Sequence, residues 1–151
     1  MICTIEQKQE FPADIEKVWN FISHPANLLL ITPPELRFKM ISENVPSEIS
    51  HGTRLQYIVS PVFGIPLRWT SIISDVRKPF YFTDEQLKGP YHSWKHVHIL
   101  RETAAGVEMT DTIQYEIGYG FAGTVLNRLL VRNKLKDILL FRFARLREIL
   151  G

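Results

Sequence analysis

The sequence predicts an α+β domain in which a curved antiparallel sheet of seven strands wraps around one long C-terminal helix. After two short helices, the chain up to Ile117 reads as strands separated by turns. The connections between these strands are short, which favours antiparallel neighbours because a parallel crossover needs a dozen or more residues. From Thr124 to Leu150, neither Pro nor Gly interrupts a run of helix-forming residues.

The first strand and the two short helices are expected at the start of the chain. Residues Ile2–Phe11 alternate between apolar and polar side chains, which is typical of a half-buried strand. Asp14 is a suitable N-cap for a helix through Ile22 whose apolar residues share one face. A second short helix is expected over Ala26–Ile31, and the two prolines that follow Thr32 end it.

Six further strands are expected, each bounded by turn-forming residues. They are Leu36–Ser42, Thr53–Ser60, Leu67–Arg77, Phe80–Leu87, Tyr91–Glu102 and Val107–Ile117. A strongly twisted sheet curls, and a single helix does not fill the resulting concave face, so space tends to remain between them. The sequence has no repeat and no linker, and residues 1–151 are expected to form one domain.

Composition narrows the class of protein. With 151 residues, of which 45% are hydrophobic and 11% aromatic, the chain can bury a core and line a cavity. The single cysteine, Cys3, cannot form an internal disulfide, and the start of the chain lacks the pattern of a signal peptide, so a cytoplasmic location is expected. No apolar run approaches the roughly 20 residues that span a bilayer.

Charge is unevenly distributed along the chain. The net charge is only +2, but residues 121–151 hold seven Lys or Arg against two Asp or Glu. A basic helix can attract an acidic ligand, an anionic lipid surface or RNA, although a solvated outer face is the simpler interpretation. Nothing in the sequence indicates DNA binding.

The last three strands carry mixed polar and apolar faces. Taken by alternation, these faces are Phe82, Asp84 and Gln86, then Trp94, His96, His98 and Leu100, and then Met109, Asp111, Ile113 and Tyr115. If they point inward, a polar group lies beneath the helix. Leaving such a group unpaired costs about 1–3 kcal/mol, so it must pair internally or with water or a ligand. Both a ligand pocket and a network that sets strand register remain open.

The same residues admit two kinds of chemistry. His96 and His98, with Asp111 on the next strand, could supply three metal ligands, but no fourth ligand is indicated. A His–Asp pair drawn from these residues or Asp84 could act as a general base, although no nucleophile motif accompanies it. Phosphate-binding loops, dinucleotide fingerprints and Cys-rich zinc patterns are missing from the sequence. We therefore expect no metal and no cofactor.

The stretch Phe82–His98 resembles the signature F-x-D-x-Q-x-x-G-P-Y-x-x-W-x-H-x-H of bacterial proteins in the START/Bet v 1-like (SRPBCC) superfamily. A following M-x-D-x-x-x-Y segment is matched by Met109, Asp111 and Tyr115, and Trp69 and the pair Phe141-Arg142 also fit. The resemblance spans the whole chain and implies a helix-grip fold with a hydrophobic cavity. Members of this superfamily bind lipids, hormones, quinones or polyketides, and some are cyclases or hydrolases. The link Ile117–Gly120 departs from the pattern because it lacks an expected proline.

The residues expected to line the cavity come from five strands and the long helix. They are Tyr57, Trp69, Phe82, Asp84, Gln86, Trp94, His96, His98, Met109, Asp111, Tyr115, Leu139 and Phe143.

The two halves of the long helix carry apolar stripes that face different ways. The helix is therefore expected either to bend near Asn133 or to present its first half to something other than the sheet. The loop Val62–Pro66 is also unusually apolar. These two segments could flank the cavity mouth, through Phe63, Ile65, Val125 and Leu129, or contact a second subunit or a membrane. Packing of the helix start against the short helices is the simpler alternative.

Three functions remain open on the sequence alone. The first is a binding or carrier protein for a small hydrophobic or amphipathic ligand, such as a lipid, a quinone or a polyketide-like molecule. The second is a cyclase- or hydrolase-type enzyme in which His96 or His98, oriented by Asp84 or Asp111, moves a proton. The third is an interaction module that uses the basic helix.

Overall fold

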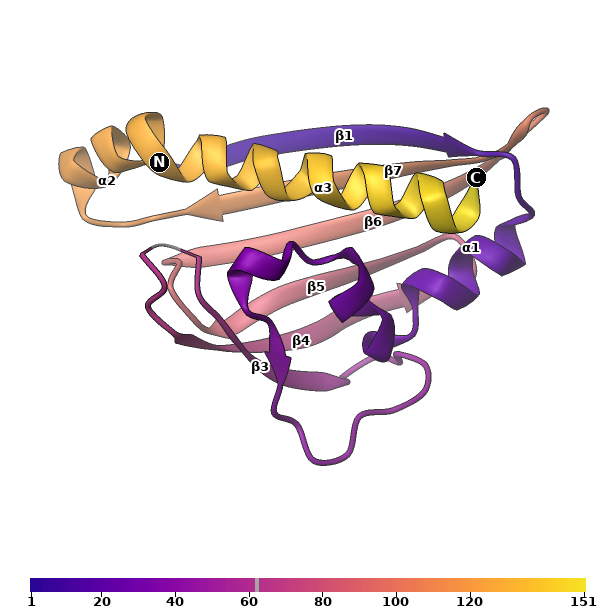
Figure 1. Ribbon diagram of the computed structural model, residues 1–151, viewed down its shortest axis with the longest axis horizontal. Helices are drawn as coiled ribbons and strands as arrows, with labels where there is room; N and C mark the ends of the chain where they lie inside the picture. The colour runs from indigo at the N-terminus through magenta and orange to yellow at the C-terminus, as the bar shows by residue number, and fades with distance from the viewer. Residues whose placement is uncertain (62) are drawn as a thin grey trace.

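Seven antiparallel strands form one curved sheet along a long C-terminal helix in the computed structural model, which describes residues 1–61 and 63–151 (Figure 1). The strands are β1 (Cys3–Phe11), β2 (Lys39–Met40), β3 (Arg54–Val59), β4 (Leu67–Arg77), β5 (Tyr81–Lys88), β6 (Ser93–Thr103) and β7 (Gly106–Glu116). The α-helices are α1 (Ile15–Ile22), α2 (Gly120–Leu126) and α3 (Arg132–Leu150); η1 (Pro25–Ile31) and η2 (Pro34–Leu36) are 3-10 helices, and η3 (Asn127–Val131) is a π-helical turn.

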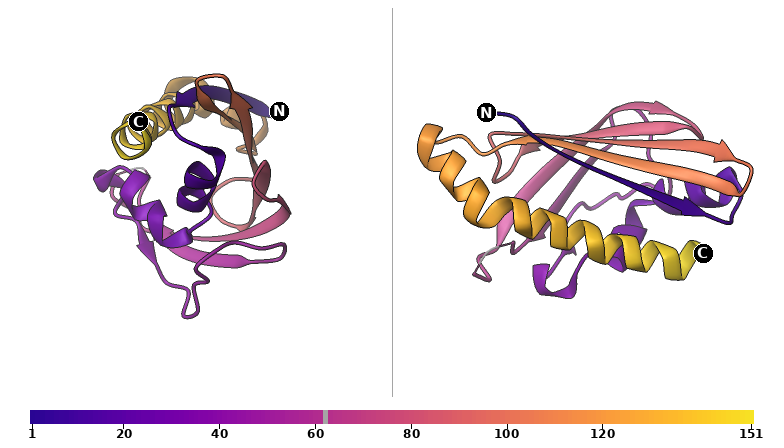
Figure 2. Two further views of the ribbon diagram at one scale, coloured as in Figure 1. Left: turned by 90° about the vertical axis from the view of Figure 1, so that its right-hand side faces the viewer. Right: turned by 90° about the horizontal axis from the view of Figure 1, so that it is seen from above.

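The sheet order is β1-β7-β6-β5-β4-β3-β2, with every neighbouring pair antiparallel. Pairing of the first strand with the last places β1 at one edge of the sheet, beside β7. The sheet curls around an interior that α3 closes along its length, while α1 lies across one end (Figure 2). This is the predicted fold class, and the helix-to-sheet geometry leaves room between the two.

Two apolar clusters anchor the helices to the sheet. The larger one joins α1 and the end of α3 to the sheet through residues such as Trp19, Leu146 and Met109. The smaller one joins the first turns of α3 to β1 and β7 through Leu135, Leu139, Ile5, Ile113 and Tyr115. As predicted, Asp14 caps α1 by accepting the backbone N–H of Lys17 at 2.8 Å.

The predicted strand Leu36–Ser42 is mostly wrong. Only Lys39 and Met40 pair with β3, because Leu36 belongs to η2 and Arg37 has a left-handed backbone with φ of 50°. The second short helix is a 3-10 helix that begins at Pro25. Tyr91 lies in the turn before β6, where its backbone N–H and carbonyl bond to the side-chain amide of Gln86. β4 has the predicted bounds, β1 ends at Phe11 as predicted, and the remaining strand ends differ by one residue from the predictions.

The long helix begins earlier than predicted. Its first residue is Gly120. Gly123 lies inside it, at a position where a Cβ would stand 1.7 Å from the carbonyl oxygen of Gly118. The change of apolar face occurs through the π-helical turn η3, which widens one turn, and Asn133 lies inside α3. Buried Asn127 in this turn accepts the hydroxyl of Tyr115 at 2.5 Å. None of the described helices is long and apolar enough to span a membrane.

Candidate functional site

A cavity of about 180 Å³ lies between the middle of the sheet, the segment from α1 to η1, and α3. Its lining is predominantly apolar and aromatic, with a few polar groups. A dry cavity of about 150 Å³ is known to hold benzene, so this space suits a molecule of one or two rings. The lining residues are Phe21, Ile22, His24, Pro25, Asn27, Leu28, Ile31, Ile49, Leu55, Tyr57, Trp69, Ser71, Ile73, Phe82, Asp84, Trp94, His96, His98 and Arg142.

The structure brings together seven of the predicted cavity residues in this lining: Tyr57, Trp69, Phe82, Asp84, Trp94, His96 and His98. The binding hypothesis depends on the expectation that the face of β6 with the two histidines points toward the interior. His96 is 5% exposed and His98 is 3% exposed, and both face the interior. Alternation along β6 therefore identified the correct face.

The other predicted lining residues do not reach the cavity. Met109, Tyr115 and Leu139 pack in the two apolar clusters, and Asp111 lies buried behind the histidines. Gln86 holds the Tyr91 turn, as described above. Phe143 is half-buried in α3 and does not line the cavity, although its carbonyl oxygen accepts Gln9 Nε2 at 2.8 Å. The strand pattern identified the inward face but not how far along each strand the cavity extends.

Several lining residues were missed in the sequence. The segment from Phe21 to Ile31 forms one wall, although its sequence reads only as two short helices. Ser71 lines the cavity between Trp69 and Ile73 on the same face of β4, so alternation could have found it. Arg142 stands four residues before buried Leu146 on α3, where a charged residue on the apolar side was a usable signal.

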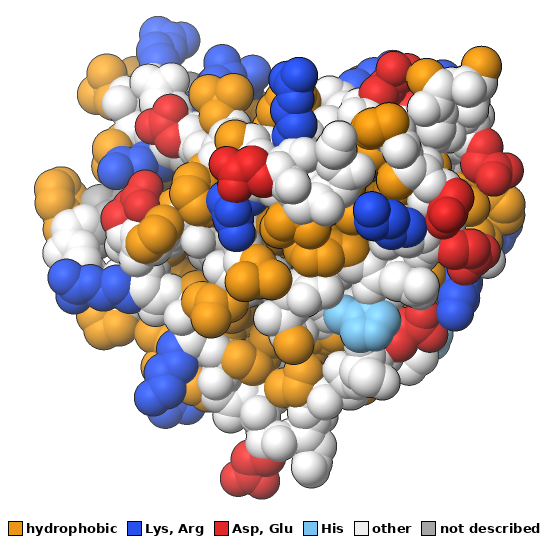
Figure 3. All heavy atoms as spheres, turned by 45° about the vertical axis from the view of Figure 1, so that its right-hand side comes forward, with side chains coloured by type: hydrophobic (Ala, Val, Ile, Leu, Met, Phe, Trp, Pro, Cys, Tyr) orange, Lys and Arg blue, Asp and Glu red, His pale blue; other side chains and the backbone are white. Residues whose placement is uncertain are grey.

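The structure does not bring the residues of the predicted cavity mouth to this cavity. None of Phe63, Ile65, Val125 and Leu129 lines the cavity, and their side chains are 90%, 56%, 39% and 73% exposed. Val62, which belongs to the same predicted segment, lies outside the described residues. Half-buried lining residues such as His24 and Leu28 place the outer wall at η1. On the face shown in Figure 3, hydrophobic side chains gather across the middle, with charged side chains around them.

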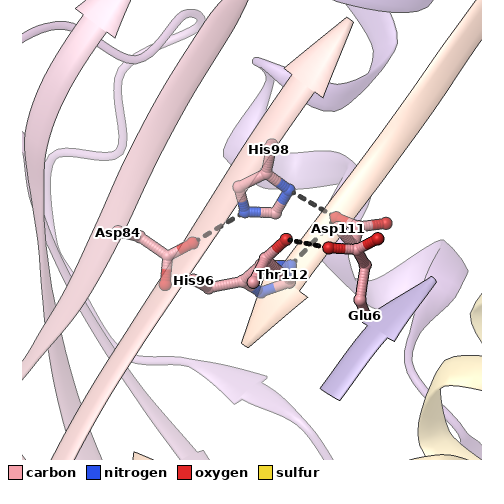
Figure 4. A network of polar contacts seen from close by, with 6 residues as sticks. All are labelled: Glu6, Asp84, His96, His98, Asp111 and Thr112. Carbon is pink, nitrogen blue, oxygen red and sulfur yellow. Dashed lines mark hydrogen bonds and ion pairs between the residues drawn. The ribbon is translucent and has the colours of Figure 1, made fainter. Parts of the chain in front are cut away.

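Four ionisable side chains from three neighbouring strands form one buried network (Figure 4). His98 Nε2 lies 2.9 Å from Asp84 Oδ2, and His96 Nε2 lies 2.9 Å from Asp111 Oδ1. His98 Nδ1 also lies 2.9 Å from Asp111 Oδ1, although this contact is bent away from hydrogen-bond geometry and acts as an ion pair. Strand register creates the network because His98 stands opposite Asp111 on β7 and His96 stands opposite Asp84 on β5.

His98 is held as a cation by its surroundings. Both of its ring nitrogens face carboxylate oxygens, an arrangement that favours the ring with a proton on each nitrogen. Burial alone would lower the pKa of His98, but the contacts with Asp111 and Asp84 outweigh burial and raise that pKa. The ring stacks between Phe82, at a centroid distance of 4.1 Å, and His96, at 3.8 Å.

The other three side chains of the network, His96, Asp111 and Asp84, have lowered pKa values. Burial, and then the charge of His98, lowers the pKa of His96, so this ring is neutral near pH 7. Burial opposes ionisation of Asp111, but the nearby Arg142 and the two histidines hold its pKa well below the ordinary value. Burial likewise opposes ionisation of Asp84, and its bond from His98 lowers the pKa overall. The network therefore has two carboxylates, one imidazolium and a neighbouring guanidinium.

Besides His98 Nδ1, which meets Asp111 as an ion pair, three buried nitrogen atoms of lining residues have no hydrogen-bond partner within residues 1–61 and 63–151. They are Trp69 Nε1, Arg142 Nε and His24 Nδ1. The first two can only donate, whereas His24 can donate or accept according to its tautomer. The polar atoms left over at the cavity wall are thus mainly donors.

The set of described residues able to hold a metal ion is Asp84, His96 and His98, whose ligand atoms lie within 4.8 Å of one another. This set has Asp84 in place of the Asp111 considered from the sequence. Both histidine Nε2 atoms already bond to carboxylates, so a cation would have to displace these contacts.

Solved structures share this fold along nearly the whole chain. Protein Ms6760 from Mycobacterium smegmatis has 18% identity and a TM-score of 0.65, covering 95% of this chain and 90% of its own. TTHA0849 from Thermus thermophilus has 16% identity and a TM-score of 0.67, covering 98% and 95%. Ginseng major latex-like protein 151 from Panax ginseng has 12% identity and a TM-score of 0.68, covering 99% and 98%.

These likenesses define the fold class. The chain has the helix-grip fold of Bet v 1-like proteins, a curved seven-stranded sheet closed by a long C-terminal helix. Sequence comparison adds nothing further, because neither the family models nor the curated proteins searched match this chain. The signature over Phe82–His98 therefore stays a resemblance to the SRPBCC superfamily.

Proposed function

We propose that this protein is a binding or carrier protein that holds a small, largely apolar molecule in the cavity beneath α3. The observation that supports this most directly is an aromatic-lined cavity with an ion-paired polar network at one wall. Tyr57 and Trp69 stack at a centroid distance of 6.0 Å, and Trp94 meets Trp69 edge-on at 5.1 Å. Such walls supply affinity by burying apolar ligand surface, while a few polar atoms orient the ligand.

The cavity favours binding over covalent chemistry. Its one serine hydroxyl among the described lining residues, that of Ser71, lies 3.1 Å from the hydroxyl of Tyr57 and has no bond to a histidine. His98 has both ring nitrogens engaged by carboxylates. A nucleophile activated by a neighbouring base needs that base within hydrogen-bond reach. The geometry therefore supports a carrier in preference to a hydrolase that forms a covalent intermediate.

Ligand binding can be tested by filling the cavity. Leu55 is 5% exposed and lines the cavity, so Leu55→Phe removes space, whereas Leu140→Phe on the outer face of α3 is a matched control. We expect 2-acetylnaphthalene to quench tryptophan fluorescence in the wild type, because Trp69 and Trp94 line the site. Leu55→Phe should weaken binding at least about tenfold through steric exclusion, while Leu140→Phe leaves it unchanged. Equal binding by both variants would mean that the probe binds elsewhere.

Native mass spectrometry of the purified protein would reveal a retained ligand.

One observation favours a second candidate function, enzymatic proton transfer. His96 lines the cavity, its Nε2 bonds to Asp111, and the neutral ring leaves Nδ1 as a potential base. Such a base could remove a proton from the carbon beside a bound carbonyl and return it. Deuterium exchange into the methyl group of 2-acetylnaphthalene, followed by NMR in D₂O, tests this. Deuterium exchange that is faster than in buffer alone and that disappears in His96→Gln would support an enzyme. If the wild type gives no exchange above the buffer rate, the carrier function is favoured.

A further inference from the structure

The two cavity histidines share one carboxylate, and each keeps a second ring nitrogen. Asp111 Oδ1 lies 2.9 Å from His96 Nε2 and 2.9 Å from His98 Nδ1, and the two rings stack at a centroid distance of 3.8 Å. A carboxylate that holds one nitrogen of a histidine fixes the tautomer and the orientation of the ring, and it is the usual outer partner of a metal-bound histidine. Asp111 therefore orients two rings whose other nitrogens, His96 Nδ1 and His98 Nε2, can bind a cation.

Both of these nitrogens can be reached without breaking the contacts of Asp111. His96 Nδ1 has no hydrogen-bond partner among the described residues and is not enclosed by protein atoms, so it is open to the cavity that His96 lines. His98 Nε2 lies 2.9 Å from Asp84 Oδ2, and the Asp84 side chain is 20% exposed at the cavity wall. A cation bound through both Nε2 atoms would break two ion pairs, whereas one bound through His96 Nδ1 and His98 Nε2 replaces only the proton between His98 and Asp84.

We propose that Asp84, His96 and His98 bind one divalent transition-metal cation of the zinc class at the cavity wall, with Asp111 as the outer carboxylate that holds both histidines. One ligand atom from each of the three residues lies within 4.8 Å of the other two. Ligand atoms at about 2.0–2.1 Å from a tetrahedral zinc lie roughly 3.4 Å apart, so the widest pair has to close by no more than about 1.4 Å. Rotation of the Asp84 side chain at the cavity wall supplies this movement.

Strand register brings the three ligands together. His96 stands opposite Asp84 on β5, and His98 follows two residues later on the same face of β6. Asp111 on β7 stands opposite His98, so the two carboxylates lie on opposite sides of the histidines (Figure 4). Strands hold a metal site more precisely than loops do. The sequence pattern offered Asp111 as the third ligand, but the structure places Asp84 on the ligand side and Asp111 behind the rings.

Three protein ligands leave a fourth position, which faces the cavity because all three ligands line it. Zinc with three protein ligands keeps this position for water or for a small molecule. His98 is neutral once its Nε2 binds the cation. Asp84 and Asp111 then carry two negative charges, while the cation and Arg142, whose charge acts on Asp111, carry three positive ones. The excess positive charge favours hydroxide or another anionic oxygen at the fourth position.

Metal titration of the purified protein tests the proposal. After treatment with a chelator and removal of the chelator, Zn²⁺ is titrated by calorimetry and Co²⁺ by tryptophan fluorescence, both near neutral pH. We expect one Zn²⁺ per chain, and Co²⁺ should quench Trp94, whose ring centroid lies 6.5 Å from that of His96. Failure of the protein to take up either cation would overturn the proposal.

Ligand variants separate this site from binding at the surface. Asp84→Ala and His96→Gln each remove one ligand and should weaken Zn²⁺ binding at least about tenfold. His92→Gln is the matched control, because His92 is exposed just before β6, and it should leave the affinity within about twofold of the wild type. Equal binding by all three variants would mean that the cation lies elsewhere, which would overturn the proposal.

X-ray absorption at the zinc edge covers the case in which a variant does not fold, because it needs only the wild type. The spectrum should show four nitrogen or oxygen ligands at about 2.0–2.1 Å, two of them with the outer-shell scattering of imidazole. Fewer than two imidazoles would overturn the proposal. The metal site and the carrier function fail separately: Zn²⁺ uptake without binding of 2-acetylnaphthalene would remove only the carrier, and the reverse result would remove only the metal site.

Discussion

Asp111 is the residue on which the buried network depends. One of its oxygens contacts both His96 and His98, and its side chain is 6% exposed. Asp84 contacts only His98, and its side chain is 20% exposed at the cavity wall. Removing one partner of a buried ion pair leaves the others uncompensated, so the two aspartates should contribute unequally to stability.

Substitution of the two aspartates tests this difference. Asp111→Ala should lower the free energy of unfolding by about 3–5 kcal/mol, since it leaves the histidines and Arg142 without their shared anion. Asp84→Ala should cost less, because His98 keeps its contact with Asp111 and water can reach the site from the cavity. Urea unfolding at pH 7 measures both, and equal losses would contradict the central role of Asp111.

The pKa values of the two buried histidines are shifted in opposite directions. We therefore expect the free energy of unfolding to be greatest near pH 6.5, the ordinary pKa of histidine. The raised pKa of His98 adds stability that is present below pH 6.5 and is lost as pH rises through the folded value. The lowered pKa of His96 acts the other way, so its contribution is lost as pH falls below 6.5. Below about pH 4, protonation of Asp111 and Asp84, whose pKa values are lowered, removes further stability.

Urea midpoints measured from pH 3 to pH 9 test this profile. His98→Asn should flatten the alkaline limb, and His96→Asn should flatten the limb between pH 5 and pH 6.5. A profile that rises steadily from pH 5 to pH 9 would show that His98 is not held as a cation.

At the scale of elements, the start of the long helix depends on a close backbone approach. A Cβ on Gly123 would meet the carbonyl oxygen of Gly118 at 1.7 Å, and Gly118 itself has a φ of 85°. Helix propensity alone predicts that Ala in place of Gly stabilises a helix by about 1 kcal/mol. The tertiary contact reverses this sign, because the loop must move to admit a methyl group.

Gly123→Ala should therefore lower the free energy of unfolding by about 1–3 kcal/mol through overpacking. Ala122→Gly is a matched control at an exposed position in the same turn of α2, and it should cost no more than about 1 kcal/mol through propensity. Thermal unfolding of the two variants compares the effects. A stabilised Gly123→Ala would mean that the backbone approach is looser than the structure has it.

At the scale of the whole molecule, the cavity is separate from the exposed apolar side chains of the Phe63 loop and of the start of the long helix. Phe63 and Leu129 are among the most exposed hydrophobic side chains, and neither lines the cavity. Phe63 borders a different hollow that includes Lys134 and Ile138. That these residues flank the mouth stays a prediction, and the half-buried residues that line the cavity on its outer side belong to the segment from His24 through η1.

Phe63→Asp and Leu129→Asp should leave the affinity for 2-acetylnaphthalene within about twofold of the wild type, because neither change alters the apolar surface that the ligand buries. The cavity variant Leu55→Phe serves as the positive control for loss of binding. Light scattering of the same samples reports whether the exposed end mediates self-association. Weakened ligand binding in either variant would return these residues to the route into the cavity.

The sequence by itself determined the order of elements, the antiparallel sheet and the inward face of β6 that carries His96 and His98. These features follow from local rules: side chains alternate with a period of two along a strand, and short turns bring neighbouring strands together. The strand periodicity also identified Phe82 as inward-facing, whereas Trp69 was expected in the cavity from the resemblance to the SRPBCC superfamily. Such predictions need no knowledge of which distant segment covers a face.

Only the tertiary structure decided where the cavity begins and ends. Met109 and Tyr115 share an inward face with Asp111, yet packing against helices buries them in the core, while Trp94 and His96 border open space. Which part of a concave sheet is filled depends on the path of the long helix. The change of apolar stripe indicated a bend near Asn133, but only the structure places a π-helical turn at Asn127–Val131. The placement of Arg142 over the network arises in the same way, because a helix and a sheet far apart in the chain meet only through packing.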